Sequence, residues 1–359
     1  MEWDGDGTDP RELRLIEGKK CGEDTRFEPI SLEELRESCR ERPEDILLPF
    51  IREGDATLIY SPSGVGKSFY ALGIAVAIAS GSEFLGYTAP KARKVLYLDG
   101  EMSKWQLKSR VDASITPKNN KLAYQNLSLA NRELSDYLFP DIGSKDGWKW
   151  AYREVIRSGV EVVVFDNFST LALGVEDENN AGSFNNTLEL ILRLKKQGVL
   201  PILLHHSNKT GNSYRGTTKI EAIFSNIISL EKTNAIDLSL GAGFKVKFTK
   251  NRNEYAEETE TRTVQLVRGD GWKVLETDED RDDRVLVELK KMTHKKQAEI
   301  AAALGVNQST IARAKKRLIA TGKIKKGQWT RYLTAANDEL GMKDEIEMDD
   351  DDDDEVINF

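Results

Sequence analysis

The sequence predicts an α/β protein whose mostly parallel sheet is covered by helices on both faces. From Ile46 onward, short and almost wholly apolar runs alternate with amphipathic runs of helical length. Strands that lack a polar face are typical of parallel sheets buried on both sides. In addition, a glycine-rich turn at residues 61–68 joins the first such strand to the first long helix, a connection that α/β folds commonly use.

The predicted elements follow one another in a regular order. Ser31 and Glu34 have the spacing of a capping box that begins a short helix, which Pro43 limits. We then expect strands at 56–60, 95–99, 160–166, 200–205, 226–231 and 244–250, and helices at 69–80, 104–113, 148–157 and 185–196. A hairpin with strands at 263–267 and 271–275 closes the predicted sheet.

The length of 359 residues suggests two domains, or one large domain with appendages. The pattern divides the chain into a mobile arm with a short helix at 1–45, an α/β domain at 46–277, a basic module at 281–333 and an acidic tail at 334–359. A charged linker at 278–283 joins the two folded parts.

The net charge of −8 by itself argues against a nucleic-acid binder. This total hides two opposed blocks. Residues 281–333 hold 14 Lys and Arg against 4 acidic residues, a net of +10, whereas residues 338–359 hold 12 acidic residues against one Lys, a net of −11. The basic block makes nucleic acid a candidate partner again.

Composition excludes several other classes of protein. The longest apolar stretch, around Ala71–Ala79, is too short to span a bilayer, and no secretory signal opens the chain. The two cysteines, Cys21 and Cys39, are too few for a metal cluster and are expected to be reduced thiols. We therefore expect a cytoplasmic protein without a membrane partner.

The sharpest motif is Ser61-Pro62-Ser63-Gly64-Val65-Gly66-Lys67-Ser68. A phosphate-binding loop (P-loop) needs inward-facing backbone N–H groups, a cation for the β- and γ-phosphates and a hydroxyl for Mg²⁺. Residues 63–68 supply them, with Lys67 as the cation and Ser68 as the hydroxyl. We predict ATP and Mg²⁺ as cofactors. Ser61 stands where the first glycine is usual, and an ordinary glycine-rich turn is the alternative.

Two further strands end in carboxylates. Asp166 closes one strand, at the place where an aspartate can hold the Mg²⁺ water shell. Glu101 follows the strand at 95–99, at a sheet edge where ligands bind, and can activate the water that attacks the γ-phosphate. The alternatives are a strand that merely ends in aspartate and a surface glutamate.

Two of the three histidines, His205 and His206, are adjacent at the end of another strand. The pair has the look of a metal site, but no third ligand has suitable spacing. We predict instead that His206 contacts the γ-phosphate. A histidine satisfied by the backbone is the alternative, above all for His205.

Residues 58–68, 95–103, 160–171 and 201–218 resemble RecA-fold hexameric helicases, nearest the RepA plasmid replication helicases and then the DnaB type. Asp99-Gly100-Glu101-Met102-Ser103 is similar to the DnaB-type Ser-Leu-Glu-Met-Ser. The resemblance covers roughly residues 46–275, and its motifs occur in the same order.

Three more motifs carry the resemblance. His205-His206-Ser207-Asn208-Lys209 is similar to the RepA His-His-Ala-Ser-Lys, and Arg215-Gly216-Thr217-Thr218 to the RepA Arg-Gly-Ser-Ser. Lys250-Asn251-Arg252-Asn253 is similar to the DnaB-type Lys-Gln-Arg-Asn, from which it departs at Asn251.

The resemblance implies a homo-oligomer, a hexameric ring above all, with ATP between subunits. Glu101 is then the catalytic base, and His206 stands where DnaB-type proteins place a γ-phosphate-sensing Gln. Lys250 and Arg252 are expected to reach the ATP of the neighbouring subunit, where an arginine offsets charge in the transition state. Arg215 is the competitor for that role.

The resemblance also places two loops, at 174–186 and 208–214, along the central channel. Lys209 and Arg215 are therefore predicted contacts for the phosphates of single-stranded DNA. The first loop is acidic, which is a poor composition for a surface that faces DNA. Plain solvated connections are the alternative for both loops.

Residues 284–333 have the pattern of a winged helix-turn-helix, with helices at 297–304 and 309–320, a turn at Gly305 and a β-wing at 322–333. Its predicted DNA-phosphate contacts are Lys315, Lys316, Arg317, Lys325 and Lys326. A module for protein docking or oligomerisation is the alternative.

The chain ends in residues 348–359, with the sequence MDDDDDDEVINF, which cannot fold alone. It resembles the acidic, Phe-terminated tails of single-stranded-DNA-binding proteins and some phage replication proteins. We therefore expect Phe359 to dock on a replication partner. A tail that lies on the basic module and a featureless solvated tail are the alternatives.

Together these features predict an ATP-dependent DNA helicase, or a helicase-like replication ATPase, of a bacterium, plasmid or phage. Two other functions fit the same motifs. One is an ATP-controlled DNA-binding regulator or initiator that uses the helix-turn-helix, and the other is a RecA-like recombination or repair ATPase.

Overall fold

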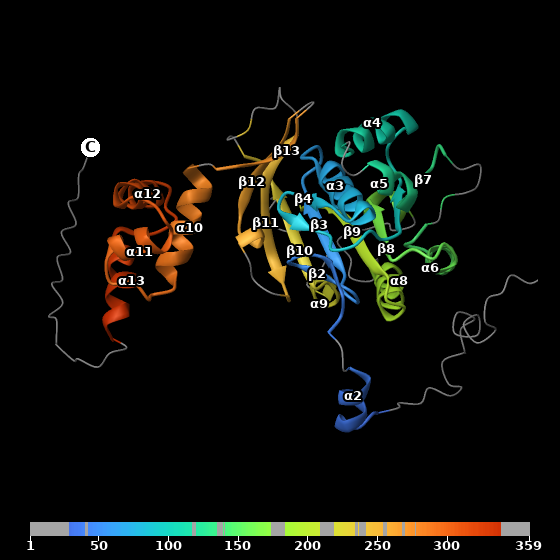
Figure 1. Ribbon diagram of the computed structural model, residues 1–359, viewed down its shortest axis with the longest axis horizontal. Helices are drawn as coiled ribbons and strands as arrows, with labels where there is room; N and C mark the ends of the chain where they lie inside the picture. Colours follow the sequence, from blue (N-terminus) through green and yellow to red (C-terminus); the bar gives the residue numbers. More distant parts are fainter. Residues whose placement is uncertain are drawn as a thin grey trace, which may run out of the picture. The chain divides into compact units, whose positions relative to one another are not determined.

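The computed structural model describes residues 29–39, 42–116, 120–134, 139, 141–173, 184–208, 219–233, 236, 242–253, 257–267, 270–276 and 278–338. These residues form two compact units, divided between Leu275 and Glu276 (Figure 1). Within the ranges described, every helix is too short or too polar to cross a bilayer.

The larger unit is built on one sheet, which among the described residues has nine strands in the order β13-β12-β11-β10-β3-β9-β8-β6-β7 (Figure 1). The strands are β3 (Thr57–Ser61), β6 (Val95–Asp99), β7 (Leu127–Asn131), β8 (Val162–Asp166), β9 (Leu200–His206), β10 (Asn226–Glu231), β11 (Gly243–Asn251), β12 (Arg262–Val267) and β13 (Gly271–Leu275). The neighbouring strands β10, β3, β9, β8, β6 and β7 pair in parallel. Strands β11, β12 and β13 add an antiparallel edge next to β10. The sheet is therefore largely parallel, as predicted, and each predicted strand is present within two residues.

Helices cover both faces of this sheet. One core cluster packs α3 (Lys67–Ser80) and α4 (Lys104–Ser114) against strand residues such as Ile59 and Val164. The other packs α6 (Lys145–Arg157), α7 (Phe168–Leu171) and α8 (Asn185–Lys196) against Leu58 and Val163. Because successive strand residues point to opposite faces, the parallel strands β3, β6, β8, β9 and β10 contribute to both clusters, which explains their almost continuous apolar sequences.

Small residues let α3 lie close to its neighbours. A Cβ added at Gly73 would come within 2.2 Å of the Phe84 ring. Phe84 belongs to a short hairpin of β4 (Glu83–Phe84) and β5 (Tyr87–Thr88), whose aromatic side chains pack on the same core. On its other side α3 contacts α5 (Asn120–Asn126), an element that the sequence pattern did not predict.

Several short elements complete the larger unit. The predicted capping box begins α2 (Leu32–Ser38), since the Ser31 hydroxyl accepts from Glu34 N at 3.1 Å and Glu34 accepts from Ser31 N at 2.7 Å. The remaining short elements are β1 (Asp45–Leu47), β2 (Ile51–Arg52), α9 (Lys219–Ile223) and the 3₁₀ turn Glu257–Thr259.

The second unit is a small helical bundle of α10 (Asp278–Lys290), α11 (Gln297–Ala303), α12 (Gln308–Ala320) and α13 (Lys326–Asp338). Its core contains side chains from all four helices, among them Leu289, Ile300, Leu318 and Trp329. Helices α11 and α12 are joined at Gly305, which has a φ of 63°, so the two predicted helices and the turn between them are present.

Two expectations for this region are wrong. The stretch at 278–283 is the first part of α10 and not a linker. The β-wing expected at 322–333 is replaced by helix α13. Trp329 is buried, and Tyr332 and Leu333 pack on the same core. This spacing of three and four residues gives a helical stripe, whereas a wing strand would alternate with a period of two.

Candidate active site

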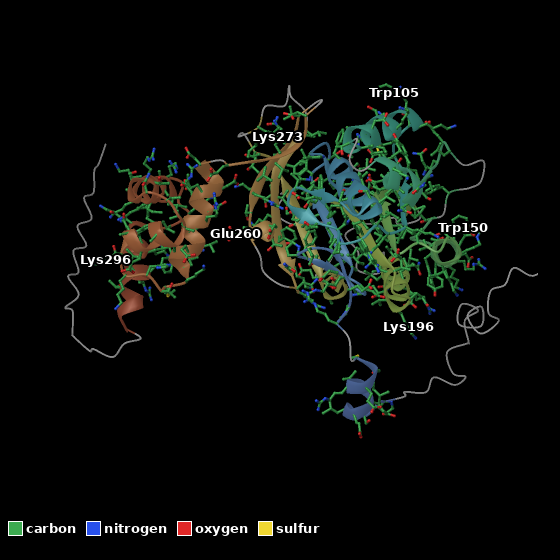
Figure 2. All side chains as sticks on the ribbon, viewed as in Figure 1. Trp105, Trp150, Lys196, Glu260, Lys273 and Lys296 are labelled. Atoms are coloured by element: carbon green, nitrogen blue, oxygen red, sulfur yellow. The ribbon has the colours of Figure 1, made fainter. Side chains whose placement is uncertain are left out.

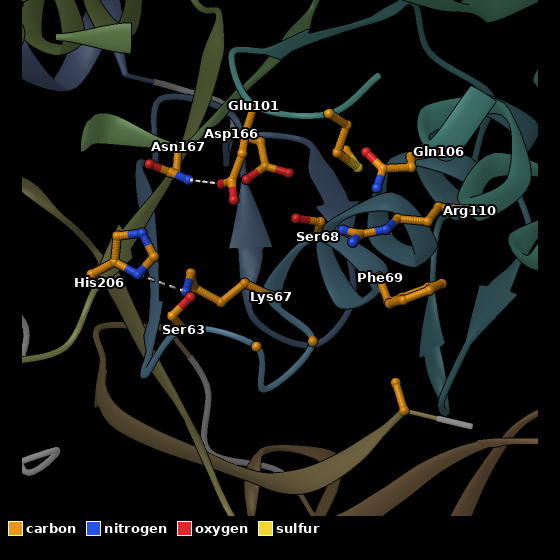
Figure 3. Close-up of a pocket in the computed structure, with 14 residues that line it drawn as sticks. Ser63, Lys67, Ser68, Phe69, Glu101, Gln106, Arg110, Asp166, Asn167 and His206 are labelled. Atoms are coloured by element: carbon orange, nitrogen blue, oxygen red, sulfur yellow. Dashed lines mark hydrogen bonds between the residues drawn. The ribbon is translucent and has the colours of Figure 1, made fainter. Parts of the chain in front are cut away.

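The carboxyl ends of β3, β6, β8 and β9 meet at one edge of the sheet and surround a cavity of about 440 Å³ (Figure 3). In such sheets ligands bind outside the carboxyl ends of the strands. The cavity is lined by Ser63, Gly64, Gly66, Lys67, Ser68, Phe69, Glu101, Met102, Gln106, Arg110, Asp166, Asn167, His206 and Ala242. It thus brings together most of the predicted phosphate loop, Glu101, Asp166 and His206.

The predicted phosphate loop connects β3 to α3, and its backbone needs glycine. Gly66 has a φ of 126°, and a Cβ there would lie 2.8 Å from the Phe244 ring. Gly64 has a φ of 77°, a region that L side chains rarely adopt. Val65 is buried, so only its backbone is available to a ligand. The loop therefore places the first backbone N–H groups of α3 at the cavity, as an anion site requires.

Ser61, the departure from the usual loop pattern, serves as a partner of Lys67. The Lys67 ammonium donates to both Ser61 O and Ser61 Oγ at 3.2 Å. Ser61 is fully buried, and a glycine here would provide the carbonyl but no hydroxyl. The substitution thus leaves the motif able to hold its lysine over the loop.

Asp166 is buried at the end of β8. Tyr97 OH donates to Asp166 Oδ2 at 2.6 Å. Burial raises the pKa of Asp166, while hydrogen bonds from Tyr97 and Ser68 and the charge of Lys67 oppose the rise. The hydrogen bond between Ser68 and Asp166 also shows that these two predicted Mg²⁺ residues are adjacent.

This pair fits Mg²⁺. Both side chains offer hard oxygen atoms, which this ion prefers, and the ion usually completes its shell with waters and substrate phosphates. Among the residues described, no group of three or more His, Cys, Asp or Glu side chains is placed to hold a metal ion. A divalent cation at Ser68 and Asp166 would therefore depend on oxygens of the nucleotide.

Glu101 is exposed at the cavity, just after β6, and its orientation is set by Asn167. Asn167 Nδ2 donates to Glu101 Oε2 at 2.8 Å (Figure 3). Asn167 is itself buried and accepts from Thr170 N as the N-cap of α7. The carboxylate is thus held by a fixed amide while it faces the cavity. Asn167 was not predicted as a site residue, although it follows Asp166 directly.

The loop that carries Glu101 is tied down by Asp99. Asp99 Oδ2 accepts from Met102 N at 3.0 Å and from the side chain of Asn131, which also donates to Met102 O at 2.6 Å. Burial raises the pKa of Asp99 to about 6, with the neighbouring charge of Asp166 as a second cause. The sequence pattern did not reveal Asn131, because its strand β7 was not predicted.

His206 reaches the P-loop from the end of β9. Its Nδ1 lies 3.2 Å from Lys67 Nζ (Figure 3). His205 points into the apolar core instead, edge-on to Phe168 at 5.1 Å between ring centroids. The structure therefore separates the two histidines, and the one predicted to contact phosphate lies at the cavity.

Helix α4 brings further residues that sequence reasoning missed. Ser103 and Gln106 form a capping box that begins the helix, and Arg110 follows one turn after Gln106. The Arg110 guanidinium lies over the Phe69 ring at 4.8 Å from its centroid. Gln106 and Arg110 are four residues apart on the predicted helix that follows Glu101, so they share one helix face. This spacing could have identified them.

Comparisons with known proteins show the family to which the chain belongs. Residues 23–212, just over half of the chain, match the family described as the AAA domain. The chain belongs to the AAA domain family. It is also 25% identical over 196 residues, 55% of its length, to the DNA repair protein RadA of Campylobacter jejuni. The aligned part is 38% of RadA, so the chain spans well under half of that relative.

Solved structures similar to this AAA protein include a KaiC-like protein of Pyrococcus horikoshii, with 17% identity and a TM-score of 0.46 over 66% of this chain and 99% of that one. The flagellar accessory protein FlaH of Methanocaldococcus jannaschii has 15% identity and a TM-score of 0.45, over 63% and 91%. Family membership, the P-loop and the largely parallel sheet identify the larger unit as an ATP-binding core with a RecA-like α/β fold.

Lys250 and Arg252 of this AAA protein lie at the opposite edge of the sheet from the cavity. Asn251, between them, pairs with Asn226 of β10, which pairs in turn with Thr57 at the start of β3. The P-loop follows the end of β3, about 13 Å further along the strand at about 3.3 Å per residue. The structure therefore does not bring these two cations to the pocket of their own subunit.

The other predicted contacts of the AAA core fall outside the described residues. This group consists of Lys209, Arg215 and most of the loops at 174–186 and 208–214. The tail beyond Asp338, which includes Phe359, also lies outside the described residues. Their roles stay predictions.

In the helical unit, the residues predicted to contact DNA differ in their exposure and in their side-chain partners. Lys316, Lys325 and Lys326 are exposed. Lys315 is half-buried, with its ammonium over the Trp329 ring at 5.5 Å.

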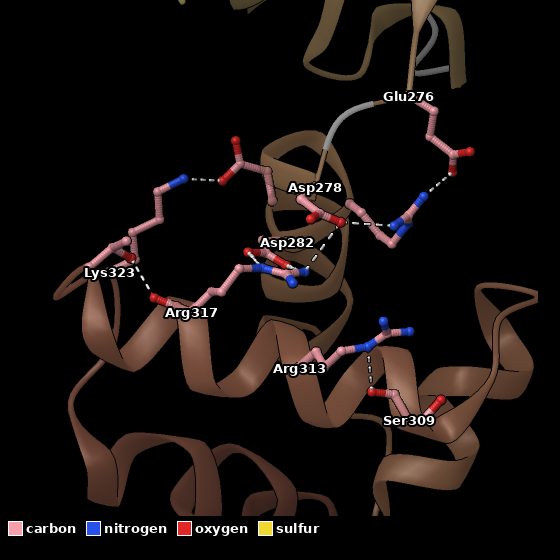
Figure 4. A network of polar contacts seen from close by, with 10 residues as sticks. Glu276, Asp278, Asp282, Ser309, Arg313, Arg317 and Lys323 are labelled. Atoms are coloured by element: carbon pink, nitrogen blue, oxygen red, sulfur yellow. Dashed lines mark hydrogen bonds and ion pairs between the residues drawn. The ribbon is translucent and has the colours of Figure 1, made fainter. Parts of the chain in front are cut away.

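Arg317 turns inward to α10 and donates two hydrogen bonds to Asp282, at 2.7 and 2.6 Å (Figure 4). Its guanidinium therefore has a partner on α10, and its role as a DNA contact stays a prediction.

Proposed function

We propose that this AAA protein is an ATP-hydrolysing motor that works as a homo-oligomer on single-stranded DNA, as a helicase or helicase-like replication ATPase. The observation that carries the proposal is the division of the catalytic set between two edges of one sheet. The P-loop, Glu101, Asp166 and His206 surround the cavity, whereas Lys250 and Arg252 lie at the other edge.

Within one subunit, the cavity can bind ATP and activate water. Lys67 and the backbone of residues 63–66 would hold the phosphates, and Arg110 with Phe69 would contact the rest of the nucleotide. Ser68 and Asp166 would hold Mg²⁺, which supplies charge stabilisation at the β- and γ-phosphates. Glu101, oriented by Asn167, would accept the proton of the attacking water.

A second subunit is needed to complete this site. Phosphoryl transfer by P-loop ATPases is strongly accelerated by a cation that offsets charge on the transferred group. Since Lys250 and Arg252 are remote from their own P-loop, they can serve only the ATP of another copy. Hydrolysis would then depend on assembly.

His206 is suited to relay the state of the nucleotide. It lines a second cavity of about 420 Å³ together with Pro62, Ser63, Ser169, Ser207 and Asn208. Asn208 is the first residue of the loop predicted to contact DNA. A γ-phosphate that binds Lys67 would compete with His206 for the ammonium and so change the position of this strand end.

A forked-duplex assay tests the proposal. ATP-dependent strand displacement that is lost in Lys67→Ala is the expected result. Arg252→Ala should be inactive alone and should regain activity when mixed with Lys67→Ala, because one kind of interface then contains an intact P-loop and an intact arginine. ATP hydrolysis with no displacement, or a mixture as inactive as either variant, would count against it.

A second candidate is an ATP-controlled DNA-binding regulator or initiator. It is favoured by the two helices α11 and α12 and the turn between them, in a small unit where Lys316, Lys325 and Lys326 are all exposed. Sequence-specific binding to duplex DNA without strand displacement would support it. A recombination or repair ATPase is the third candidate, favoured by the 25% identity to RadA, and filaments in place of rings on DNA would support it.

A further inference from the structure

Three cations gather on the last carbonyls of helix α9. Lys250 Nζ donates to Glu221 O, Arg252 Nη2 donates to Ala222 O at 3.3 Å, and Lys195 Nζ donates to Ile223 O at 3.0 Å. These acceptors are consecutive residues, so the three cationic groups lie within about one helical turn of each other. Lys195 comes from the end of α8, and the other two come from the end of β11.

The cluster lies at the sheet edge opposite to the P-loop. Helix α8 ends before β9 begins, and β9 runs parallel to β3 towards the nucleotide cavity. Lys195 therefore shares the edge on which the register of β11 places Lys250 and Arg252. Like them, it cannot reach the P-loop of its own chain.

Local electrostatics show that the three charges act on one another. Burial lowers the pKa of Lys195, and the charge of Arg252 adds to the effect while Asp55 opposes it. Burial also lowers the pKa of Lys250, with Arg252 as the next cause.

The carboxylate of Asp55 has other partners, since it accepts from Asn253 Nδ2 at 2.7 Å and from Arg52 N at 2.8 Å. A concentrated anion that approached the cluster would relieve the repulsion among the cations.

We propose that Lys195 is a third trans-acting cation, which together with Lys250 and Arg252 binds the triphosphate of a nucleotide held by a second copy of this chain. The inference rests on the proposed oligomeric ATPase and extends it by one residue. The carbonyls of α9 hold the three side chains close together, so that less side-chain freedom is lost when the phosphate binds.

The arrangement favours a nucleotide over DNA as the ligand. A triphosphate concentrates several negative charges in one small group, whereas a DNA strand spreads one charge per nucleotide along an extended backbone. Three cations within one helical turn match the compact anion.

The test compares Lys195→Gln with Lys195→Arg in the full-length chain. Glutamine keeps a donor for Ile223 O but loses the charge, and arginine keeps both. Lys196→Gln is the matched control, because Lys196 is the next residue and is exposed at the end of α8 (Figure 2). If Lys195→Gln lowers Tm, Lys195→Met, which retains the apolar stem, replaces it.

We expect Lys195→Gln to lower kcat for ATP hydrolysis by at least about tenfold, while binding of a fluorescent ATP analogue by the isolated subunit and Tm stay unchanged. Lys195→Arg and Lys196→Gln should hydrolyse ATP like the unmodified protein. Mixing Lys195→Gln with Lys67→Ala should restore turnover, because some interfaces then combine a sound P-loop with an intact cluster. A structural role as a helix cap would change Tm and would not be complemented.

Equal kcat in Lys195→Gln and Lys196→Gln would overturn the inference, as would a mixture with Lys67→Ala that shows no gain. A loss of single-stranded DNA affinity with unchanged kcat would also overturn it and would assign Lys195 to DNA. The Arg252→Ala mixture separates this inference from the proposed function. If Arg252→Ala is complemented and Lys195→Gln is fully active, only the role of Lys195 fails.

Discussion

The Lys67 ammonium donates to Nδ1 of His206 over 3.2 Å and so joins the P-loop to the end of β9. Because an ammonium can only donate, Nδ1 must accept, which requires the neutral imidazole with its proton on Nε2. A γ-phosphate oxygen would compete for the same ammonium. If His206 senses the γ-phosphate, as proposed, this contact would form without ATP and would break when ATP binds.

Replacing His206 with Ala should uncouple DNA from hydrolysis. We expect the Kd for ATP to stay within about threefold, because Lys67 and the backbone loop are retained, while stimulation of turnover by single-stranded DNA is lost. His206→Gln, which can still accept and donate, should keep part of the stimulation. Steady-state ATP hydrolysis with and without DNA measures both, and full stimulation in His206→Ala would remove this residue from the relay.

Glu101→Gln should bind ATP and hydrolyse it about 10²- to 10⁴-fold more slowly, the range expected for loss of a general base. The amide is isosteric with the carboxylate but cannot accept a proton from water. Glu133→Gln serves as the control, because Glu133 is a nearby exposed carboxylate that accepts from Lys104 N at 3.0 Å. Single-turnover hydrolysis at the unmodified rate in Glu101→Gln would mean that another group activates the water.

Asp99 should make the stability of the protein depend on pH. Its pKa is about 6 in the fold against 3.8 for an unperturbed aspartate, so the folded chain retains this proton up to a higher pH than the unfolded chain. The stabilising effect is present at low pH and is lost as the pH rises through about 6. Between about pH 5 and about pH 8 the free energy of unfolding should therefore fall by about 1 kcal/mol from this group.

Urea titrations at the two pH values check this expectation. Asp99→Asn should show a fall smaller by about 1 kcal/mol, whereas Glu83→Gln, which changes an exposed carboxylate, should behave like the unmodified protein. An unchanged pH dependence in Asp99→Asn would show that Asp99 is ionised throughout.

In the helical unit, alanine substitutions of the neighbouring residues Arg317 and Lys316 should have different effects on stability. Arg317→Ala leaves the Asp282 carboxylate, 8% exposed, without its two hydrogen bonds. We expect a loss of about 1–3 kcal/mol in stability. Lys316→Ala should leave Tm unchanged.

If α12 lies on DNA, Lys316→Ala should lower the slope of log affinity against log salt by about one. Thermal unfolding and DNA titrations at several salt concentrations measure the two effects. An equal loss of DNA affinity in Arg317→Ala with no change in Tm would support Arg317 as a DNA contact and not as a structural ion-pair partner.

Much of the larger unit could be predicted because its signals are local. Buried strands such as β8 and β9 are continuous apolar runs, and the P-loop is a contiguous motif whose geometry depends on Gly64, Gly66 and Lys67. The ends of β6, β8 and β9 gave Glu101, Asp166 and His206, because parallel strands share one carboxyl edge. In the second unit the same reasoning mistook α13 for a wing, since a basic stretch with a glycine fits both structures until the burial of Trp329 is known.

The sequence by itself determined the fold class, the nucleotide motif and the three strand-end residues Glu101, Asp166 and His206, since each depends on periodicity or on neighbours along the chain. Only the tertiary structure decided which polar groups are paired. Arg317 is bound to Asp282, Asn167 and Asn131 hold the Glu101 region, and Lys195 joins Lys250 and Arg252. Such pairs join residues that are far apart in sequence, and they form only when packing of the apolar core has brought their elements together.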